Sequence, residues 1–111
     1  MKAKPTRRSA RLADQIAREM ATALVEDVQD PRLMLVTISG VALNADLSIA
    51  RVYYTLSGDE ARLAEAAEGL EQAKGFLRTL LGKRLRLRSV PQLRFARDTY
   101  LEDMVYARPE A

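Results

Sequence analysis

The stretch EQAKGFLRTLLGKRLRLR, from Glu71 to Arg88, predicts the joint between two helices. A helical pattern runs up to Ala73, the small-residue segment Ala73-Lys74-Gly75 interrupts it, and a second helical pattern begins at once. Residues 74–97 hold eight basic residues and no acidic one. A bent helix pair with so much unopposed positive charge suits an anionic polymer. The alternative is that Gly75 merely breaks a helix and that the arginines form a solvated face.

The charges of the chain are segregated along its length. Residues 1–11 carry five basic and no acidic residues, and residues 12–73 carry four basic and eleven acidic residues. Residues 98–111 carry one basic and four acidic residues. The formal net charge of +3 therefore hides two basic and two acidic segments, a pattern that favours a nucleic acid as partner.

Length and composition narrow the class of protein. The 111 residues, 48% of them hydrophobic, support one compact domain, which we expect to be a monomer. No apolar run approaches the roughly 20 residues of a membrane span, and the basic N-terminus lacks the apolar region of a secretory signal, so we expect a cytoplasmic protein without a membrane partner. The absence of cysteine and histidine removes the commonest metal ligands and general bases. Most familiar catalytic arrangements are therefore excluded, and we expect no cofactor and no metal site.

The first half of the chain predicts a helix followed by a β-hairpin. Apolar residues recur every four positions from Leu12 to Val28, and Thr6 is a suitable N-cap for that helix. Residues 33–43 predict a strand with a bulge at Ser39-Gly40, because the apolar parity slips there. Residues 47–56 predict the return strand, with Ala50, Val52 and Tyr54 facing the core.

The second half predicts two helices and a final strand. Residues 61–73 form an acidic helix, the basic helix follows the break, and Pro91 ends the helical region before a strand that contains Leu93 and Phe95. The order α-β-β-α-α-β matches a type II KH-like domain, which is an α+β fold with a three-stranded sheet and helices on one face. We expect residues 1–5 to be a basic flexible arm, residues 6–98 the domain, and residues 99–111 a short C-terminal tail.

Four segments make the resemblance more specific. They resemble bacterial ribosome-binding factor A over about residues 7–103, in the right order. The segments are Asp30-Pro31-Arg32, the hairpin around Asn44-Ala45-Asp46-Leu47, Ala73-Lys74-Gly75-Phe76-Leu77-Arg78, and the run from Leu87 to Phe95 followed by Asp98. The resemblance implies a non-enzymatic factor that binds the immature 30S subunit and 16S rRNA. It also implies a role in late maturation and 5′-end processing of 16S pre-rRNA, and in growth in the cold.

The resemblance and the charge pattern together predict the binding residues. Ordinary KH modules clamp a nucleic-acid backbone with a Gly-x-x-Gly loop, which this chain lacks. The family has an Ala-x-Gly kink in that place, and this implies binding roles for Lys74 and Gly75. Free amides at the start of the second helix could receive a phosphate. From charge alone we add eight basic residues to the expected RNA-binding set: Arg78, Lys83, Arg84, Arg86, Arg88, Arg7, Arg8 and Arg11.

Two other functions remain open at this level. One is a generic KH-like binder of single-stranded nucleic acid without a connection to ribosomes. The other is a metal-dependent nuclease, for which the only sign is the group Glu26, Asp27 and Asp30 at the end of the first helix. The acids lie at a helix end without partner ligands, and a solvated helix end explains them adequately.

Overall fold

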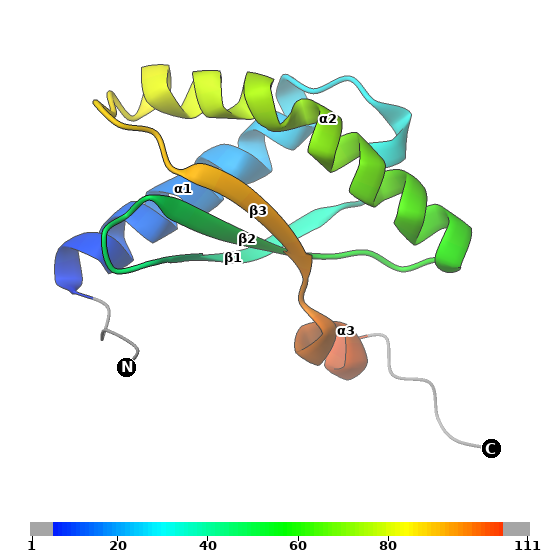
Figure 1. Cartoon of the computed structure of the whole chain (residues 1–111). Coiled ribbons are helices and arrows are strands. Elements are labelled where there is room, and N and C mark those ends of the chain that lie inside the picture. Colours follow the sequence, from blue (N-terminus) through cyan, green and yellow to red (C-terminus); the bar gives the residue numbers. More distant parts are fainter. Residues whose placement is uncertain (1–5, 106–111) are drawn as a thin grey trace.

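The computed structural model describes residues 6–105, in which helices pack against a single three-stranded sheet (Figure 1). The expected arm, residues 1–5, and residues 106–111 of the expected tail lie outside the described residues. The elements follow in the order α1 (Arg7–Glu26), a 3-10 turn η1 (Pro31–Leu33), β1 (Thr37–Leu43), β2 (Ile49–Thr55), α2 (Glu60–Arg84), β3 (Gln92–Arg97) and α3 (Thr99–Val105).

The sheet is mixed and its strands lie in the order β1-β2-β3. β1 and β2 form the expected antiparallel hairpin, and the register shifts between Ile38 and Gly40, which confirms the predicted bulge. β3 pairs with β2 in parallel, with Ala50 opposite Leu93 and Val52 opposite Phe95. Two parallel neighbours need a crossover connection, and α2 supplies it.

The core lies between the sheet and the helices α1 and α2, which cover the same face (Figure 1). The expected stripe of α1 is buried at Ile16 and Met20, and Thr6 caps the helix by accepting a hydrogen bond from the amide of Ser9 at 3.0 Å. Strand β2 buries its predicted inward residues, and α2 adds three leucines that solvent does not reach: Leu70, Leu77 and Leu81. The predicted α+β, KH-like class is confirmed.

The expected pair of helices on either side of Gly75 is instead one helix. α2 runs without interruption through Ala73, Lys74 and Gly75, and it bends near its middle (Figure 1). A glycine inside a helix costs only about 1 kcal/mol relative to alanine, which the burial of leucines on both sides easily exceeds. The Thr79 hydroxyl donates to the Gly75 carbonyl oxygen at 3.0 Å, a type of contact that bends helices.

Two element boundaries also differ from expectation. The first strand begins at Thr37 rather than at residue 33, because Asp30 caps a 3-10 turn that takes up Leu33. In the segment expected to be a tail, residues 99–105 form the helix α3. This helix is held to the body by Glu102, whose carboxylate accepts hydrogen bonds from the Leu56 amide at 3.0 Å and from Arg97 at 2.8 Å.

Candidate nucleic-acid interface

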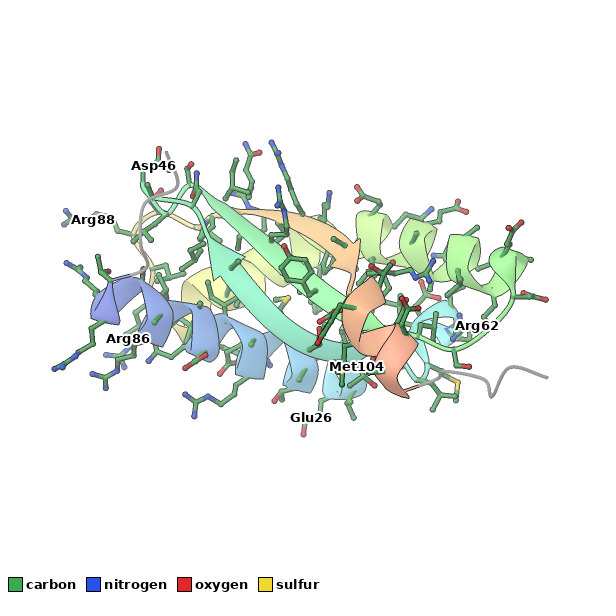
Figure 2. The ribbon with its side chains drawn as sticks, turned by 90° about the horizontal axis from the view of Figure 1, so that it is seen from below. Glu26, Asp46, Arg62, Arg86, Arg88 and Met104 are labelled. Carbon is green, nitrogen blue, oxygen red and sulfur yellow. The ribbon has the colours of Figure 1, made fainter. Side chains whose placement is uncertain are left out.

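One end of the molecule gathers basic side chains from two segments that are far apart in the sequence. α1 begins at this end, and the turn that follows α2 lies there with Arg86 and Arg88 (Figures 1 and 2). We call the following six exposed residues the basic end: Arg7, Arg8, Arg11, Lys83, Arg86 and Arg88. No described carboxylate lies within 4.0 Å of any of them, in contrast to the paired arginines elsewhere in the fold.

The turn after α2 holds Arg86 in an unusual backbone conformation. The amide of Leu87 donates to the carbonyl of Gly82 at 3.0 Å, which is the Schellman closure of a helix C-terminus. The residue that closes such a turn takes left-handed dihedrals and is usually glycine, but here it is Arg86, with φ of 53°. The backbone strain at this position is borne by a residue whose guanidinium is exposed at the basic end.

The start of α1 adds arginines where the helix itself does not favour them. The first turn of α1 contains no acidic residue, and the positive end of the helix dipole faces Arg7 and Arg8. Basic residues there are unfavourable by a few tenths of a kcal/mol each. A phosphate bound at this end would reverse the sign of that contribution.

Two of the expected binding residues also make contacts within the fold. Arg78 donates from Nε to the Pro91 carbonyl at 3.1 Å and from Nη2 to the Val90 carbonyl at 2.9 Å, so it ties α2 to the segment before β3. Arg84 pairs with Asp27 at 2.9 Å and lies 3.6 Å from Glu19, which ties the end of α2 to α1. The hydrogen bond to Asp27 raises the pKa of Arg84. Their charges are therefore less available to a ligand than the sequence suggested.

The expected amides at Gly75 are not free, because Gly75 lies inside α2 rather than at its start. The predicted phosphate site on those amides is therefore wrong. Lys74 is half-buried and pairs with Glu71 at 2.7 Å. The surface at Gly75 is nevertheless open, since a Cβ placed there would meet no atom within 4 Å. Gly75, Thr79 and Lys83 are spaced four residues apart and all exposed, so an open face of α2 leads to the basic end.

Arg51 and Arg94 form a further pair of exposed basic residues, and the sequence did not indicate that they are neighbours. Arg51 of β2 and Arg94 of β3 are register neighbours and exposed, on the sheet face opposite the core residues Val52 and Leu93. Strand alternation places each arginine outside, but only the parallel register of β2 and β3 puts them side by side. No described carboxylate lies within 4.0 Å of either.

Two of the three acids that suggested a nuclease are engaged as partners of arginines, and the third, Glu26, is exposed. Asp27 pairs with Arg84, and Asp30 accepts from Arg32 at 2.7 Å. The hydrogen bond from the Arg32 side chain keeps the pKa of Asp30 below its ordinary value. No group of three or more potential ligands that could hold a metal ion occurs among residues 6–105. Within the same residues, none of the helices combines the length and the apolarity that a membrane crossing requires.

The fold and the basic end together define the class of KH-like domains, whose members bind nucleic acids. Comparison with known proteins narrows this class. The sequence model of Ribosome-binding factor A matches residues 8–108. Ribosome-binding factor A of Thioalkalivibrio sulfidiphilus is 46% identical over 91 residues, which are 82% of this chain and 70% of that protein.

Solved structures agree with the sequence comparison. The crystal structure of ribosome-binding factor A from Thermus thermophilus superposes with a TM-score of 0.71 at 32% identity and covers 80% of this chain and 94% of that one. A homology model of the Thermus thermophilus protein, fitted into a cryo-electron microscopy map of its 30S complex, gives a TM-score of 0.65 at 32% identity, covering 79% of this chain and 92% of that one. The chain belongs to the ribosome-binding factor A family.

Proposed function

We propose that the protein binds the immature 30S ribosomal subunit through 16S rRNA and assists late maturation and 5′-end processing of 16S pre-rRNA. Family membership supports the proposal, as does the 30S complex of the Thermus thermophilus relative. The family is one of non-catalytic ribosome biogenesis factors, so the protein acts by binding. We place this function in the cytoplasm, where bacterial subunits are assembled, and assign it to a monomer.

The basic end is the part of the interface that meets rRNA phosphates. The observation that carries this assignment is that six exposed basic side chains from α1 and from the end of α2 gather there without a described acidic partner. Lys74 and Gly75 border the same surface along α2. Arg78 and Arg84, which hold the fold together, contribute mainly by keeping α2 in place.

Binding of this kind recognises the shape and backbone charge of RNA rather than its base sequence. Phosphate contacts fix position and register but carry no direct sequence information. A factor that binds one local rRNA arrangement better than another shifts the population toward the first by its differential affinity. The protein thus favours one conformation of the immature subunit and needs no chemical step of its own.

The division of the chain follows from the same proposal. Residues 6–98 form the RNA-binding domain, and residues 1–5 contribute two further basic residues, Lys2 and Lys4. Residues 99–111 are the C-terminal segment, which begins with α3. All six residues of the basic end lie within residues 6–98.

The proposal is tested by comparing three ligands at one salt concentration. We expect the protein to cosediment with immature 30S subunits more strongly than with mature ones, and to bind short single-stranded oligonucleotides weakly. Tight binding to oligonucleotides without binding to either particle would instead indicate a generic KH-like binder. Equal binding of both particles would remove the maturation role but leave the ribosomal one.

A further inference from the structure

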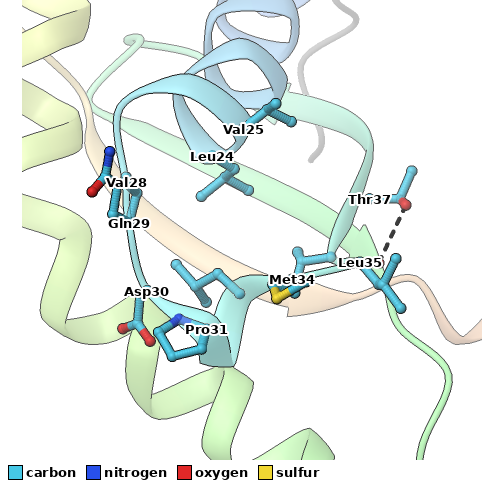
Figure 3. Close-up of a pocket in the computed structure, with 11 residues that line it drawn as sticks. Leu24, Val25, Val28, Gln29, Asp30, Pro31, Met34, Leu35 and Thr37 are labelled. Carbon is cyan, nitrogen blue, oxygen red and sulfur yellow. Dashed lines mark hydrogen bonds between the residues drawn. The ribbon is translucent and has the colours of Figure 1, made fainter.

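An apolar hollow of about 650 Å³ lies where the last turn of α1 meets the loop before β1 (Figure 3). Val25, Met34 and Leu35 are exposed among its lining residues. Its one lining carboxylate, Asp30, is paired with Arg32 at 2.7 Å, so the lining of the hollow offers RNA no unpaired charge. We assign the hollow no ligand. The uncovered face of the sheet differs from it in this respect.

Neither α1 nor α2 covers one face of the three-stranded sheet, which we call the outer face, and α3 lies at one end of it (Figures 1 and 2). Strand alternation directs the residues of the outer face away from the core, because neighbours such as Val52 and Leu93 are buried. Two rows of register partners cross the face. The first row holds Ala42, Arg51 and Arg94, and the second row holds Gly40, Tyr53 and Ala96.

Arg51 and Arg94 bring two positive charges side by side. Both side chains are exposed, and neighbouring strands are about 4.8 Å apart. Like charges directly opposite each other destabilise a sheet. No described carboxylate, the exposed Asp103 of α3 included, lies within 4.0 Å of either arginine. A phosphate between the two guanidinium groups would reverse the sign of this contribution.

Other carboxylates near the two ends of the outer face are engaged with other partners. Asp46 accepts hydrogen bonds within its hairpin turn, and Glu102 is paired with Arg97 at 2.8 Å. Asp98 accepts a hydrogen bond from the Ser39 hydroxyl at 2.9 Å. The arginine pair therefore gives the middle of the outer face a positive charge that these acids do not neutralise by direct contact.

Tyr53 adds an aromatic surface next to the arginine pair. It is half-buried, and two residues of one strand separate it from Arg51 by about 6.6 Å. Its neighbours in the register are small, Gly40 on β1 and Ala96 on β3. A Cβ placed at Gly40 would meet no atom within 4 Å, so the space beside the tyrosine is open there. Aromatic side chains on an open sheet face are the surfaces on which RNA-binding domains stack unpaired bases.

The outer face begins next to the basic end. The Gln92 amide donates to the Ser48 carbonyl at 2.9 Å, which ties the start of β3 to the hairpin turn. Figure 2 shows Asp46 of that turn at the same end of the molecule as Arg88. Arg51 lies three residues beyond Ser48, or about 10 Å along the strand. An RNA strand held at the basic end can therefore continue onto the outer face.

We propose that the outer face binds a single-stranded segment of RNA, with a phosphate between Arg51 and Arg94 and the adjoining base stacked on Tyr53. The inference rests on the proposed function and adds a second RNA contact to it. Single-stranded RNA presents a charge and a flat π surface together, whereas an acidic peptide would satisfy only the arginines. A duplex keeps its bases stacked inside, so the outer face selects rRNA that is not yet paired.

The substitution Tyr53→Trp tests the stacking contact. The chain contains no other tryptophan, so the fluorescence of the variant reports on this position alone. Titration with an oligouridylate of about ten nucleotides should quench the fluorescence to saturation, because a base stacks on the indole ring. A duplex RNA of the same length should cause little quenching. An oligoglutamate of similar length should not displace the RNA at equal concentration.

The arginine pair is tested in the same Tyr53→Trp background. Replacing Arg51→Gln and Arg94→Gln together removes a repulsion and should leave the protein at least as stable. It should weaken binding of the oligouridylate by about tenfold. Arg18→Gln is the matched control, because it neutralises an exposed arginine of α1 and should leave the affinity unchanged. In the parent chain, the same two substitutions should weaken binding to immature 30S subunits by about threefold or more.

Several results would overturn the proposal. They are an absence of quenching by the single strand, equal quenching by the duplex, displacement by oligoglutamate, and an affinity for RNA or for immature subunits that survives the loss of both arginines. The fluorescence titration needs only the single substitution, so it remains decisive if the arginine variant does not fold. A parent protein that fails to bind subunits, with quenching by the single strand retained in Tyr53→Trp, would instead refute the proposed function alone.

Discussion

Among residues 6–105, three non-glycine residues take left-handed backbone dihedrals, and each lies in a turn at the surface. Leu35, Leu47 and Arg86 have φ of 68°, 62° and 53°. Each costs about 1 kcal/mol that a glycine would not. Arg86 presents its exposed side chain at the basic end, to which we assign a binding role. Its side chain therefore contributes something that the fold alone does not require.

The substitution Arg86→Gly separates folding from binding at one residue. Glycine fits the left-handed position that closes the Schellman turn, so the free energy of unfolding should rise by about 0.5–1 kcal/mol. Binding to immature subunits should weaken by about threefold, because one phosphate contact is lost. Urea unfolding and cosedimentation measure the two effects. A more stable variant that binds as well as the parent would remove Arg86 from the interface.

The substitution Gly75→Ala separates folding from binding at the bend of α2. The added methyl meets no atom within 4 Å, and alanine is the better helix former, so the free energy of unfolding should rise by about 0.5–1 kcal/mol. Subunit binding should weaken, because the Cβ holds an approaching RNA backbone away from the helix. Gly69→Ala is a control for the stability effect, since its methyl would crowd Leu33 at 3.0 Å and should destabilise the fold.

At the scale of elements, α3 depends on one buried carboxylate. The Glu102 side chain is 7% exposed and pairs with Arg97 at 2.8 Å. Burial opposes its ionisation, but the hydrogen bonds from Arg97 and from the Leu56 amide outweigh burial and lower the pKa of Glu102 below the ordinary value of 4.5. A carboxyl group with a lowered pKa stabilises the fold above its ordinary pKa, and this contribution is lost as the pH falls through the folded-state value.

The substitution Glu102→Gln should therefore destabilise the protein by about 1 kcal/mol near neutral pH and by less in acid. The measurement is urea unfolding of parent and variant at about pH 7 and about pH 3. A difference in unfolding free energy that stays constant between these conditions would show that the ionised carboxylate does not anchor α3. Circular dichroism would check that α1 and α2 remain formed in the variant.

An element can be predicted from the sequence when the residues that determine it lie close together in the chain. The stripe of α1, the N-cap at Thr6 and the bulge beside Gly40 depend on neighbouring residues, and the sequence predicted all three. The continuity of α2 was missed, because leucines packed in the core outweigh one glycine. The anchoring roles of Arg78 and Arg84 were also missed, since their partners lie on other segments and no local pattern indicates them.

The whole molecule is elongated, with principal extents of 49, 34 and 19 Å, and its charge is divided along its length. The charge segregation visible in the sequence becomes a basic end, at which Figure 2 shows Arg86 and Arg88. The gathering of α1 and the turn after α2 at one end could not be read from the sequence, because it depends on the packing of the two helices. The sequence did indicate that the protein has a basic surface.

Binding to immature subunits should depend strongly on salt and little on pH. If each side chain of the basic end neutralises one phosphate, the logarithm of affinity should fall with the logarithm of salt concentration at a slope of about −4. Histidine is absent from the chain. The pKa values of Asp30, Asp46 and Glu102 are lowered and that of Tyr54 is raised, so each of these shifts moves a pKa further from pH 7. Affinity should thus be nearly constant between about pH 5 and pH 8. A slope near zero, or a steep transition in that pH range, would contradict this electrostatic description.

The most direct test of the central claim is cosedimentation of the double variant Arg86→Glu and Arg88→Glu with immature 30S subunits. The control is Arg18→Glu, which reverses an exposed arginine outside the basic end. If the basic end holds rRNA, the double variant should lose at least tenfold in affinity with unchanged unfolding free energy, while the control binds like the parent. Undiminished binding of the double variant, or an equal loss in the control, would contradict the assignment of rRNA binding to the basic end.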